Sequence, residues 1–133
     1  MYTLDFKSST RLATCHEDIQ KVILKVIDFV PILITAGHRG KDEQDRLYLE
    51  KKTQVLFPHS KHNSMPSVAV DIVLLKDGKP EWNDRDALSS LASLVMGIAW
   101  AYGVNLRWGG DWDQDGDVSD NKFDDLFHFE LVP

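Results

Sequence analysis

The sequence contains a single cysteine, Cys15, in 133 residues, which excludes an internal disulfide bond. It has no apolar run approaching the roughly 20 residues that a membrane-spanning helix requires. Residues 1–7 lack the basic and then apolar segments of a secretory signal. We therefore expect a protein without membrane insertion that accumulates in the cytoplasm where it is made. Cys15 is predicted to pack in the core as an inert residue.

Positive charge is also scarce, because 15 lysines and arginines stand against 21 acidic residues and give a formal net charge of -6. The sequence has no basic cluster of the kind that holds a phosphate backbone, which excludes nucleic acid and anionic membranes as main partners. The negative charge is concentrated in residues 111–125, where Lys122 is the only cation. The acidic residues of this segment are Asp111, Asp113, Asp115, Asp117, Asp120, Asp124 and Asp125. Such crowding favours a bound cation.

Hydrophobic spacing predicts one α+β domain of a size that buries a sizeable core. Helices are expected over residues 17–29, 41–52 and 85–102, and residues 8–12 are expected to form a lead-in turn. Strands are expected over residues 32–36, 68–75, 104–108 and 127–132, with a tight hairpin at Asp77-Gly78. The predicted architecture is a small, mostly antiparallel sheet with helices packed on one face and the other face open for a site.

An aspartate inside an apolar strand is the first sign of such a site. A buried carboxylate is unfavourable without a partner, so Asp71 needs one. His128 alternates with Phe127 and Phe129 and therefore lies on the opposite strand face from these two aromatic residues. His62 lies in a polar loop before the Asp71 strand. Two histidines and one aspartate, with no fourth strong ligand, fit a catalytic zinc site that keeps one position open for water.

The acidic segment begins like a calcium-binding loop. Acids at positions 1, 3 and 5, a glycine at 6 and a carbonyl donor at 7 correspond to Asp111, Asp113, Asp115, Gly116 and Asp117. Position 12 is Lys122, where a bidentate glutamate belongs, so Asp117 and Asp120 would have to complete the oxygen shell. We predict a weak calcium site here, and the alternative is a solvated acidic turn.

Several motifs resemble one family, the zinc D-Ala-D-Ala and L-Ala-D-Glu peptidases that cut peptidoglycan stem peptides. The main matches are Ser60-x-His62, Ala69-x-Asp71 and Asp125-x-x-His128-Phe129-Glu130. Further matches are Gly37-His38-Arg39 with Gln44 downstream, and Trp108-Gly109-Gly110-Asp111-Trp112. Within the family, the chain is most similar to the short phage endolysins with L-alanyl-D-glutamate endopeptidase activity.

The resemblance implies a hedgehog/DD-peptidase-like fold with His62, Asp71 and His128 as zinc ligands. It also implies Asp125 as the catalytic base and Arg39 as the cation that steadies the developing oxyanion. Ser60 and Glu130 are predicted to contact the substrate, with Glu130 alternatively supporting the zinc ligands. The implied partner is a peptidoglycan stem peptide, and the protein is expected to be a monomer. It is expected to stay in the cytoplasm of the infected host until it is released to the cell wall.

The segment from His62 to Asp71 is longer than is usual in the family. Either this loop bulges, or His59 replaces His62 as a ligand. Two other functions also remain open: a D-Ala-D-Ala carboxypeptidase or dipeptidase with the same chemistry, and a non-catalytic zinc and calcium module that binds cell wall, as in hedgehog-type relatives. Retention of Asp125 at the matched spacing favours an enzyme.

Overall fold

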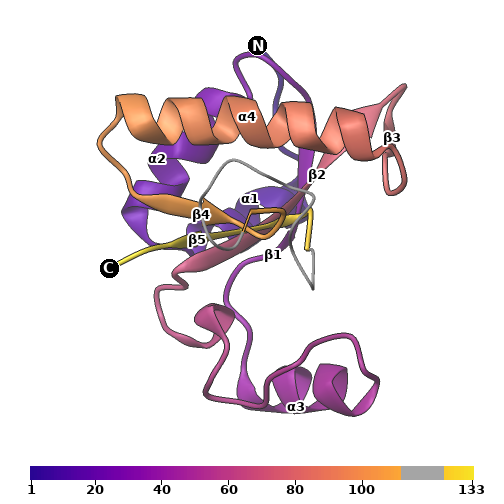
Figure 1. Cartoon of the computed structure of the whole chain (residues 1–133), viewed down its shortest axis with the longest axis vertical. Coiled ribbons are helices and arrows are strands. Elements are labelled where there is room, and N and C mark those ends of the chain that lie inside the picture. The colour runs from indigo at the N-terminus through magenta and orange to yellow at the C-terminus, as the bar shows by residue number, and fades with distance from the viewer. Residues whose placement is uncertain (112–124) are drawn as a thin grey trace.

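An antiparallel sheet forms the centre of the computed structural model, which describes residues 1–111 and 125–133 (Figure 1). Its strand order is β1-β2-β5-β4, and β3 pairs with the far end of β2. The strands are β1 (Ile32–Ala36), β2 (Ala69–Lys76), β3 (Lys79–Pro80), β4 (Leu106–Trp108) and β5 (His128–Leu131). The helices are α1 (Phe6–Ala13), α2 (Glu17–Val26), α3 (Lys41–Leu49) and α4 (Arg85–Ala101), with a 3-10 turn η1 (Lys61–Asn63).

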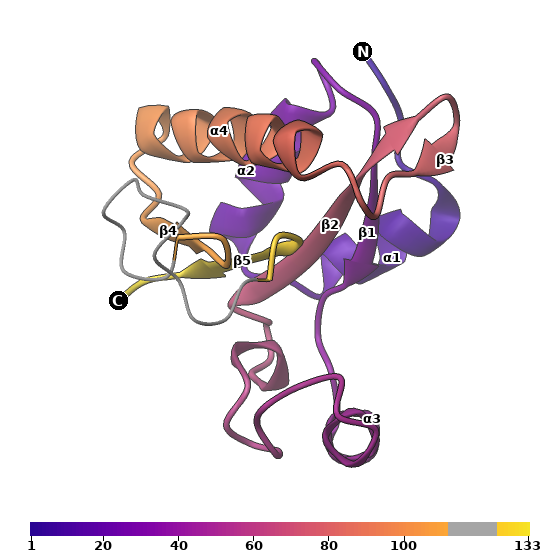
Figure 2. The same ribbon diagram turned by 45° about the vertical axis from the view of Figure 1, so that its right-hand side comes forward.

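The two faces of the sheet differ in chemistry. Val70, Ile72 and Phe129 point from β2 and β5 into a hydrophobic core that is closed by α2 and α4. Because side chains alternate along a strand, Asp71 and His128 point to the opposite face. Figure 2 shows α2 and α4 on one side of the sheet, and α3 on the other side within the long connection from β1 to β2. This connection borders the open face, where the predicted site residues lie.

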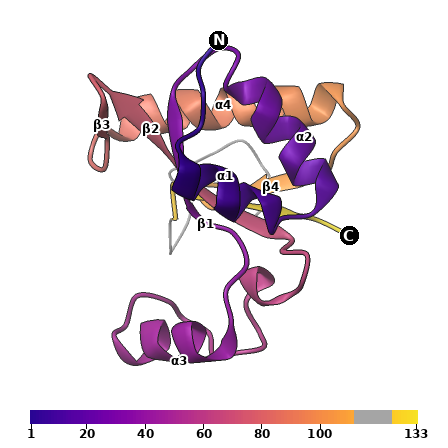
Figure 3. The ribbon, with the colours of Figure 1, turned by 180° about the vertical axis from the view of Figure 1, so that it is seen from behind.

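Helix α1 corrects one prediction, because residues 8–12 were expected to form only a turn. The run of hydroxyl residues in this segment has modest helix propensity, but tertiary contacts stabilise the helix. Asp5 caps its N-terminus by accepting a hydrogen bond from the Ser8 amide at 2.7 Å. The buried Ser8 hydroxyl in turn accepts one from the Ile34 amide at 2.9 Å. Figure 3 shows α1 lying beside β1.

The other predicted elements are present with small differences at their ends. Helices α2 and α3 each stop about one turn earlier than expected, at Val26 and Leu49. Asp77 and Gly78 form the expected tight hairpin, with φ angles of 54° and 77°.

Cys15 is buried as predicted, and burial raises the pKa of its thiol to about 11. The predicted α+β class with a mainly antiparallel sheet is confirmed, and the core-forming helices α2 and α4 lie on one face, with α3 outside this layer. Within the described ranges, no helix has the length and apolarity needed to cross a membrane.

Candidate active site

Three side chains from separate parts of the sequence meet on the open face of the sheet. Asp71 of β2 and His128 of β5 are register partners, and η1 places His62 beside them. Three atoms form a nearly equilateral triangle, with 3.2 Å from His62 Nε2 to Asp71 Oδ1, 3.1 Å from His128 Nδ1 to Asp71 Oδ1, and 3.2 Å between the two nitrogens. In a tetrahedral zinc site, ligand atoms about 2.0–2.1 Å from the metal lie roughly 3.3 Å apart. The triangle therefore has the dimensions of a metal site.

The second nitrogen of each histidine ring shows where the ring proton lies, and therefore which nitrogen directs a lone pair into the triangle. His62 Nδ1 lies 2.8 Å from the Gly37 carbonyl oxygen, which can only accept, so this nitrogen carries the proton. His128 Nε2 lies 2.8 Å from the Glu130 carboxylate and is likewise the donor. In the neutral rings, the lone pairs of His62 Nε2 and His128 Nδ1 then point at the same space as the Asp71 carboxylate. Three acceptors that converge without a donor between them favour a positive charge at their centre, and this donor set could hold a divalent metal ion.

The local charges also favour a cation at this position. Burial opposes ionisation of Asp71, but His62 and His128 outweigh this effect and hold the pKa of its carboxyl group well below the ordinary range. Burial likewise opposes protonation of His128, yet hydrogen bonds to Asp71 and Glu130 raise the pKa of its ring. Both shifts show that the surroundings stabilise positive charge among these side chains. A metal ion bound at this position would take the place of that proton, because metal binding releases protons.

The long connection from His62 to Asp71 bulges away from the triangle. Its residue Ser67 is bound between α1 and α2, where the Ser67 amide donates to the Thr14 carbonyl and the His16 amide donates to the Ser67 carbonyl, both at 2.8 Å. The additional residues are therefore absorbed in this contact, and His62 still reaches Asp71. His59 lines the cleft beside the site but is not among the three converging side chains.

Glu130 and Arg107 support His128 from the side. Glu130 is 5% exposed, and Arg107 Nη2 donates to its Oε2 across the β4–β5 pair at 2.7 Å. A carboxylate that accepts from a ligating histidine fixes the orientation of the ring and makes it a stronger ligand. Glu130 also borders the cleft, so its predicted contact with substrate stays a prediction. Arg107 has no signal in the sequence that marks it as part of the site, because its pairing with Glu130 depends on a strand register that spacing alone does not give.

Asp125 enters the cleft from the turn before β5. Its amide donates to the Gly109 carbonyl at 2.9 Å, and the Gly109 amide donates to the His128 carbonyl at 2.8 Å. A side chain at Gly109 would collide with the Asp125 carbonyl, so this position requires glycine. The Trp108-Gly109-Gly110 motif thus holds Asp125 against the strand that carries His128. Burial, followed by the negative charge of Asp71, raises the pKa of Asp125, which suits a group that must accept a proton near neutral pH.

Arg39 lies on the other side of the triangle. Its Nη2 is 3.6 Å from Asp71 Oδ2, and its Nη1 donates to Gln44 Oε1 at 3.0 Å. Gln44 is fully buried and also donates to the Val55 carbonyl at 2.7 Å. Asn63, next to His62, donates to the Arg39 carbonyl at 3.0 Å. This network fixes the guanidinium beside the triangle and explains why a glutamine follows the Gly-x-Arg motif.

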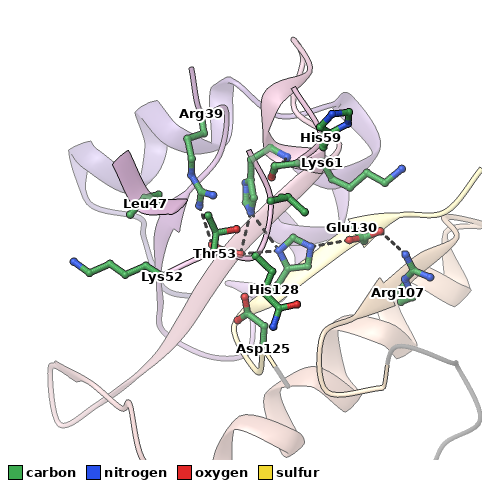
Figure 4. A pocket seen from close by; sticks show the side chains of 15 residues that line it. Arg39, Leu47, Lys52, Thr53, His59, Lys61, Arg107, Asp125, His128 and Glu130 are labelled. Atoms are coloured by element: carbon green, nitrogen blue, oxygen red, sulfur yellow. Dashed lines mark hydrogen bonds and ion pairs between the residues drawn. The ribbon is translucent and has the colours of Figure 1, made fainter. Parts of the chain in front are cut away.

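The triangle, Arg39, Asp125, Glu130 and Arg107 line one cleft of about 570 Å³. Figure 4 shows this cleft from close by. Arg39 and His128 face it from opposite sides, with Asp125 below His128. Ser60 lines the same cleft and caps η1, because its hydroxyl accepts from the His62 amide at 3.1 Å. Its predicted contact with substrate stays a prediction. Of the predicted calcium ligands, only Asp111 is described, and Asp113, Asp115, Asp117 and Asp120 lie outside the described residues.

The fold and this site match known peptidases. A family model described as phage L-alanyl-D-glutamate peptidase matches residues 1–132. The L-alanyl-D-glutamate peptidase of Escherichia phage T5 is 29% identical over 130 residues, which cover 94% of each chain. The peptidoglycan L-alanyl-D-glutamate endopeptidase CwlK of Bacillus subtilis is 31% identical over 117 residues, which cover 78% of this chain and 62% of CwlK. The crystal structure of the Serratia marcescens L-Ala D-Glu endopeptidase ChiX has a TM-score of 0.76 at 26% identity, and the match covers 96% of this chain and 87% of ChiX.

These matches define a small peptidase domain with an antiparallel sheet. The chain belongs to the phage L-alanyl-D-glutamate peptidase family. The resemblance predicted from its motifs is confirmed, and so is the class of enzyme, a peptidase that acts on peptidoglycan. The matches favour the L-Ala-D-Glu bond over the D-Ala-D-Ala bond, and an enzyme over a non-catalytic module.

Proposed function

We propose that this protein is a zinc-dependent L-alanyl-D-glutamate endopeptidase of the phage endolysin type. The observation that carries the proposal is the triangle of three acceptor atoms at tetrahedral spacing, with Asp125 and Arg39 facing the same cleft. His62, Asp71 and His128 would hold the metal ion and leave one position open to the cleft. All of these residues come from one chain, which agrees with action as a monomer.

Each remaining group has a separate role in cutting the bond between L-alanine and D-glutamate. A zinc ion at this site supplies Lewis-acid polarisation of the substrate carbonyl and lowers the pKa of water. Asp125 accepts the proton of the attacking water and returns it to the nitrogen of D-glutamate as that amine leaves. Arg39 directs its guanidinium at the carbonyl oxygen, which becomes negative in the tetrahedral transition state.

Digestion of purified peptidoglycan tests the proposal directly. Mass analysis should find stem-peptide fragments that begin with D-glutamate, together with glycan chains that retain L-alanine. Release of free D-alanine in place of these products would support the alternative D-Ala-D-Ala activity. Removal of metal should abolish cleavage, and stoichiometric zinc should restore it.

The proposed role of Arg39 predicts that Arg39→Lys lowers turnover far more than the retained positive charge would suggest. Lysine cannot reproduce the planar fork that donates to Gln44 while facing Asp71. Loss of one oxyanion donor typically lowers turnover by about 10²–10³-fold. Steady-state hydrolysis of a soluble stem peptide measures the effect, and Arg46→Lys on the exposed side of α3 is the matched control. Unchanged turnover in Arg39→Lys would assign this residue a purely structural role.

We also propose that calcium regulates the enzyme through the acidic segment. Asp111, Asp113, Asp115, Asp117 and Asp120 would supply the oxygen ligands, and this segment leads directly to Asp125 and His128. Without a glutamate at position 12, the affinity is expected to be weak, about 10⁻⁴ to 10⁻³ M, as in extracellular calcium modules. The enzyme would then be idle in the host cytoplasm, where free calcium is low, and become active after release to the cell wall.

A calcium titration of wall lysis at constant zinc checks this regulation. Activity should rise as calcium reaches the expected range, because calcium binding stabilises the arrangement that presents Asp125. A calcium-selective chelator is needed so that the zinc site is left intact. The double substitution Asp113→Ala and Asp115→Ala should remove the response. A flat titration, or a double variant that responds like the wild type, would leave the segment as a solvated acidic turn.

A further inference from the structure

The active-site cleft is rich in positive charge, although the protein as a whole is acidic. The formal net charge of the chain is -6. The cleft nevertheless has lysine and arginine side chains in its lining, namely Arg39, Lys52, Lys61 and Arg107. Its acidic residues are Asp71, Asp125 and Glu130. A cation in this cleft that does not pair with an acidic residue of the protein is available to bind a negatively charged group of the substrate.

Three of the four cations already have acidic partners. Arg39 lies 3.6 Å from Asp71, and Arg107 donates to Glu130 at 2.7 Å. Lys52 forms a 3.0 Å ion pair with Glu50. In Figure 4, the side chain of Lys52 extends away from His128, on the side of the cleft where Arg39 lies.

Lys61 differs from the other three cations. Among the described residues, its ammonium group makes no ion pair and no hydrogen bond with a side chain, and the residue is exposed. Its backbone, however, is held firmly. Ser60 caps the η1 turn that contains Lys61, and the Lys61 carbonyl accepts from the Val68 amide at 3.3 Å. Within the described ranges, Lys61 therefore has an unpaired side-chain charge on a well-held backbone, directly before His62.

The position of Lys61 separates it from the groups assigned to the reacting carbonyl. Figure 4 shows Lys61 on the Glu130 side of His128, whereas Arg39 lies on the opposite side. A peptide that crosses the triangle with its scissile bond facing Asp125 would therefore have Arg39 near one flank and Lys61 near the other.

The substrate supplies a matching anion. A glutamyl residue has two carboxyl groups, and the stem peptide continues through only one of them. The other group stays free on the residue whose nitrogen leaves in the reaction, a few bonds from the cleaved amide. We propose that Lys61 is a specificity residue that binds this free carboxylate of the D-glutamyl residue. The proposal rests on the proposed function, because it takes the bond between L-alanine and D-glutamate as the one cleaved.

Two soluble stem peptides test the subsite. They differ only in whether the free group of the D-glutamyl residue is a carboxylate or a carboxamide. The wild type should prefer the carboxylate peptide by about tenfold in kcat/KM, the size expected for one hydrogen bond to a charged group. Lys61→Met should reduce this preference to near unity, mainly by slowing the carboxylate peptide. Lys61→Arg should retain most of it.

Lys52→Met is the matched control, because it removes a cation from the same cleft and should keep the wild-type preference. Bound zinc should be unchanged in all variants, since neither Lys61 nor Lys52 is among the three side chains that could hold the metal ion. A Lys61→Met enzyme that still prefers the carboxylate peptide, or a Lys52→Met enzyme that loses the preference, would overturn the proposal. A wild type that cleaves the two peptides equally would also overturn it while leaving the proposed function intact. A wild type that cleaves neither peptide would overturn the proposed function itself.

Discussion

Asp125→Asn should lose turnover by about 10²–10⁴-fold while retaining its metal ion, the range expected when a general base is removed. The amide has nearly the same shape as the carboxylate and keeps an oxygen that can accept from the Phe127 amide, so the local turn should persist. It cannot accept the proton of the attacking water. Hydrolysis of a soluble stem peptide, measured beside the zinc content of the purified protein, separates the two effects.

Asp28→Asn is a suitable control for this substitution, because Asp28 pairs with Lys25 just beyond α2, in a part of the chain that does not line the cleft. It should behave like the wild type in both assays. An Asp125→Asn enzyme with near wild-type turnover would remove Asp125 from the mechanism. Loss of zinc together with activity would place Asp125 among the groups that hold the metal.

The second large effect is expected for His128→Ala, which should lose both metal and activity. His128 offers one of the three converging atoms, and its removal leaves only His62 and Asp71 facing the site. Loss of an outer partner of a ligand typically lowers metal affinity by about 10–100-fold, so loss of the ligand itself should exceed that range. Equilibrium zinc binding in competition with a chromophoric chelator measures the affinity without relying on catalysis.

His59→Ala provides the matched control for His128→Ala. His59 lines the same cleft, is also a histidine, and lies outside the triangle. It should keep the wild-type zinc affinity. The assignment of ligands would be wrong if His128→Ala bound zinc as tightly as the wild type, or if His59→Ala lost the metal.

The β4–β5 pair holds the groups that surround His128. This strand pair joins Arg107 to Glu130, and Glu130 accepts from His128. The Gly109 turn at the end of β4 holds Asp125. The proposed metal ligand His128 and the proposed base Asp125 are therefore positioned by one strand pair, so a shift in its register would move both groups together.

Much of the fold followed from the sequence because the determining signals are local. The alternation of Val70, Asp71 and Ile72 specifies which side chains share a strand face, independently of where the strand lies. Gly103 ends α4 with a positive φ of 71°, and Asp84 caps the start of that helix. Helix α1 was missed because the Ser8 contact with Ile34 joins residues that are far apart in the sequence.

The candidate site also has features that follow from local sequence and features that depend on long-range contacts. The sequence by itself determined the residue types and short spacings that carry the chemistry, including Asp125-x-x-His128 and the acid inside an apolar strand. Only the tertiary structure decided that His62 rather than His59 faces Asp71, because the connecting loop is held by Ser67 against the α1–α2 junction. It also decided that Arg107 supports Glu130, since that pair depends on the register of β4 against β5. The physical reason is that spacing fixes local direction, whereas contacts between distant residues depend on how strands pair and loops pack.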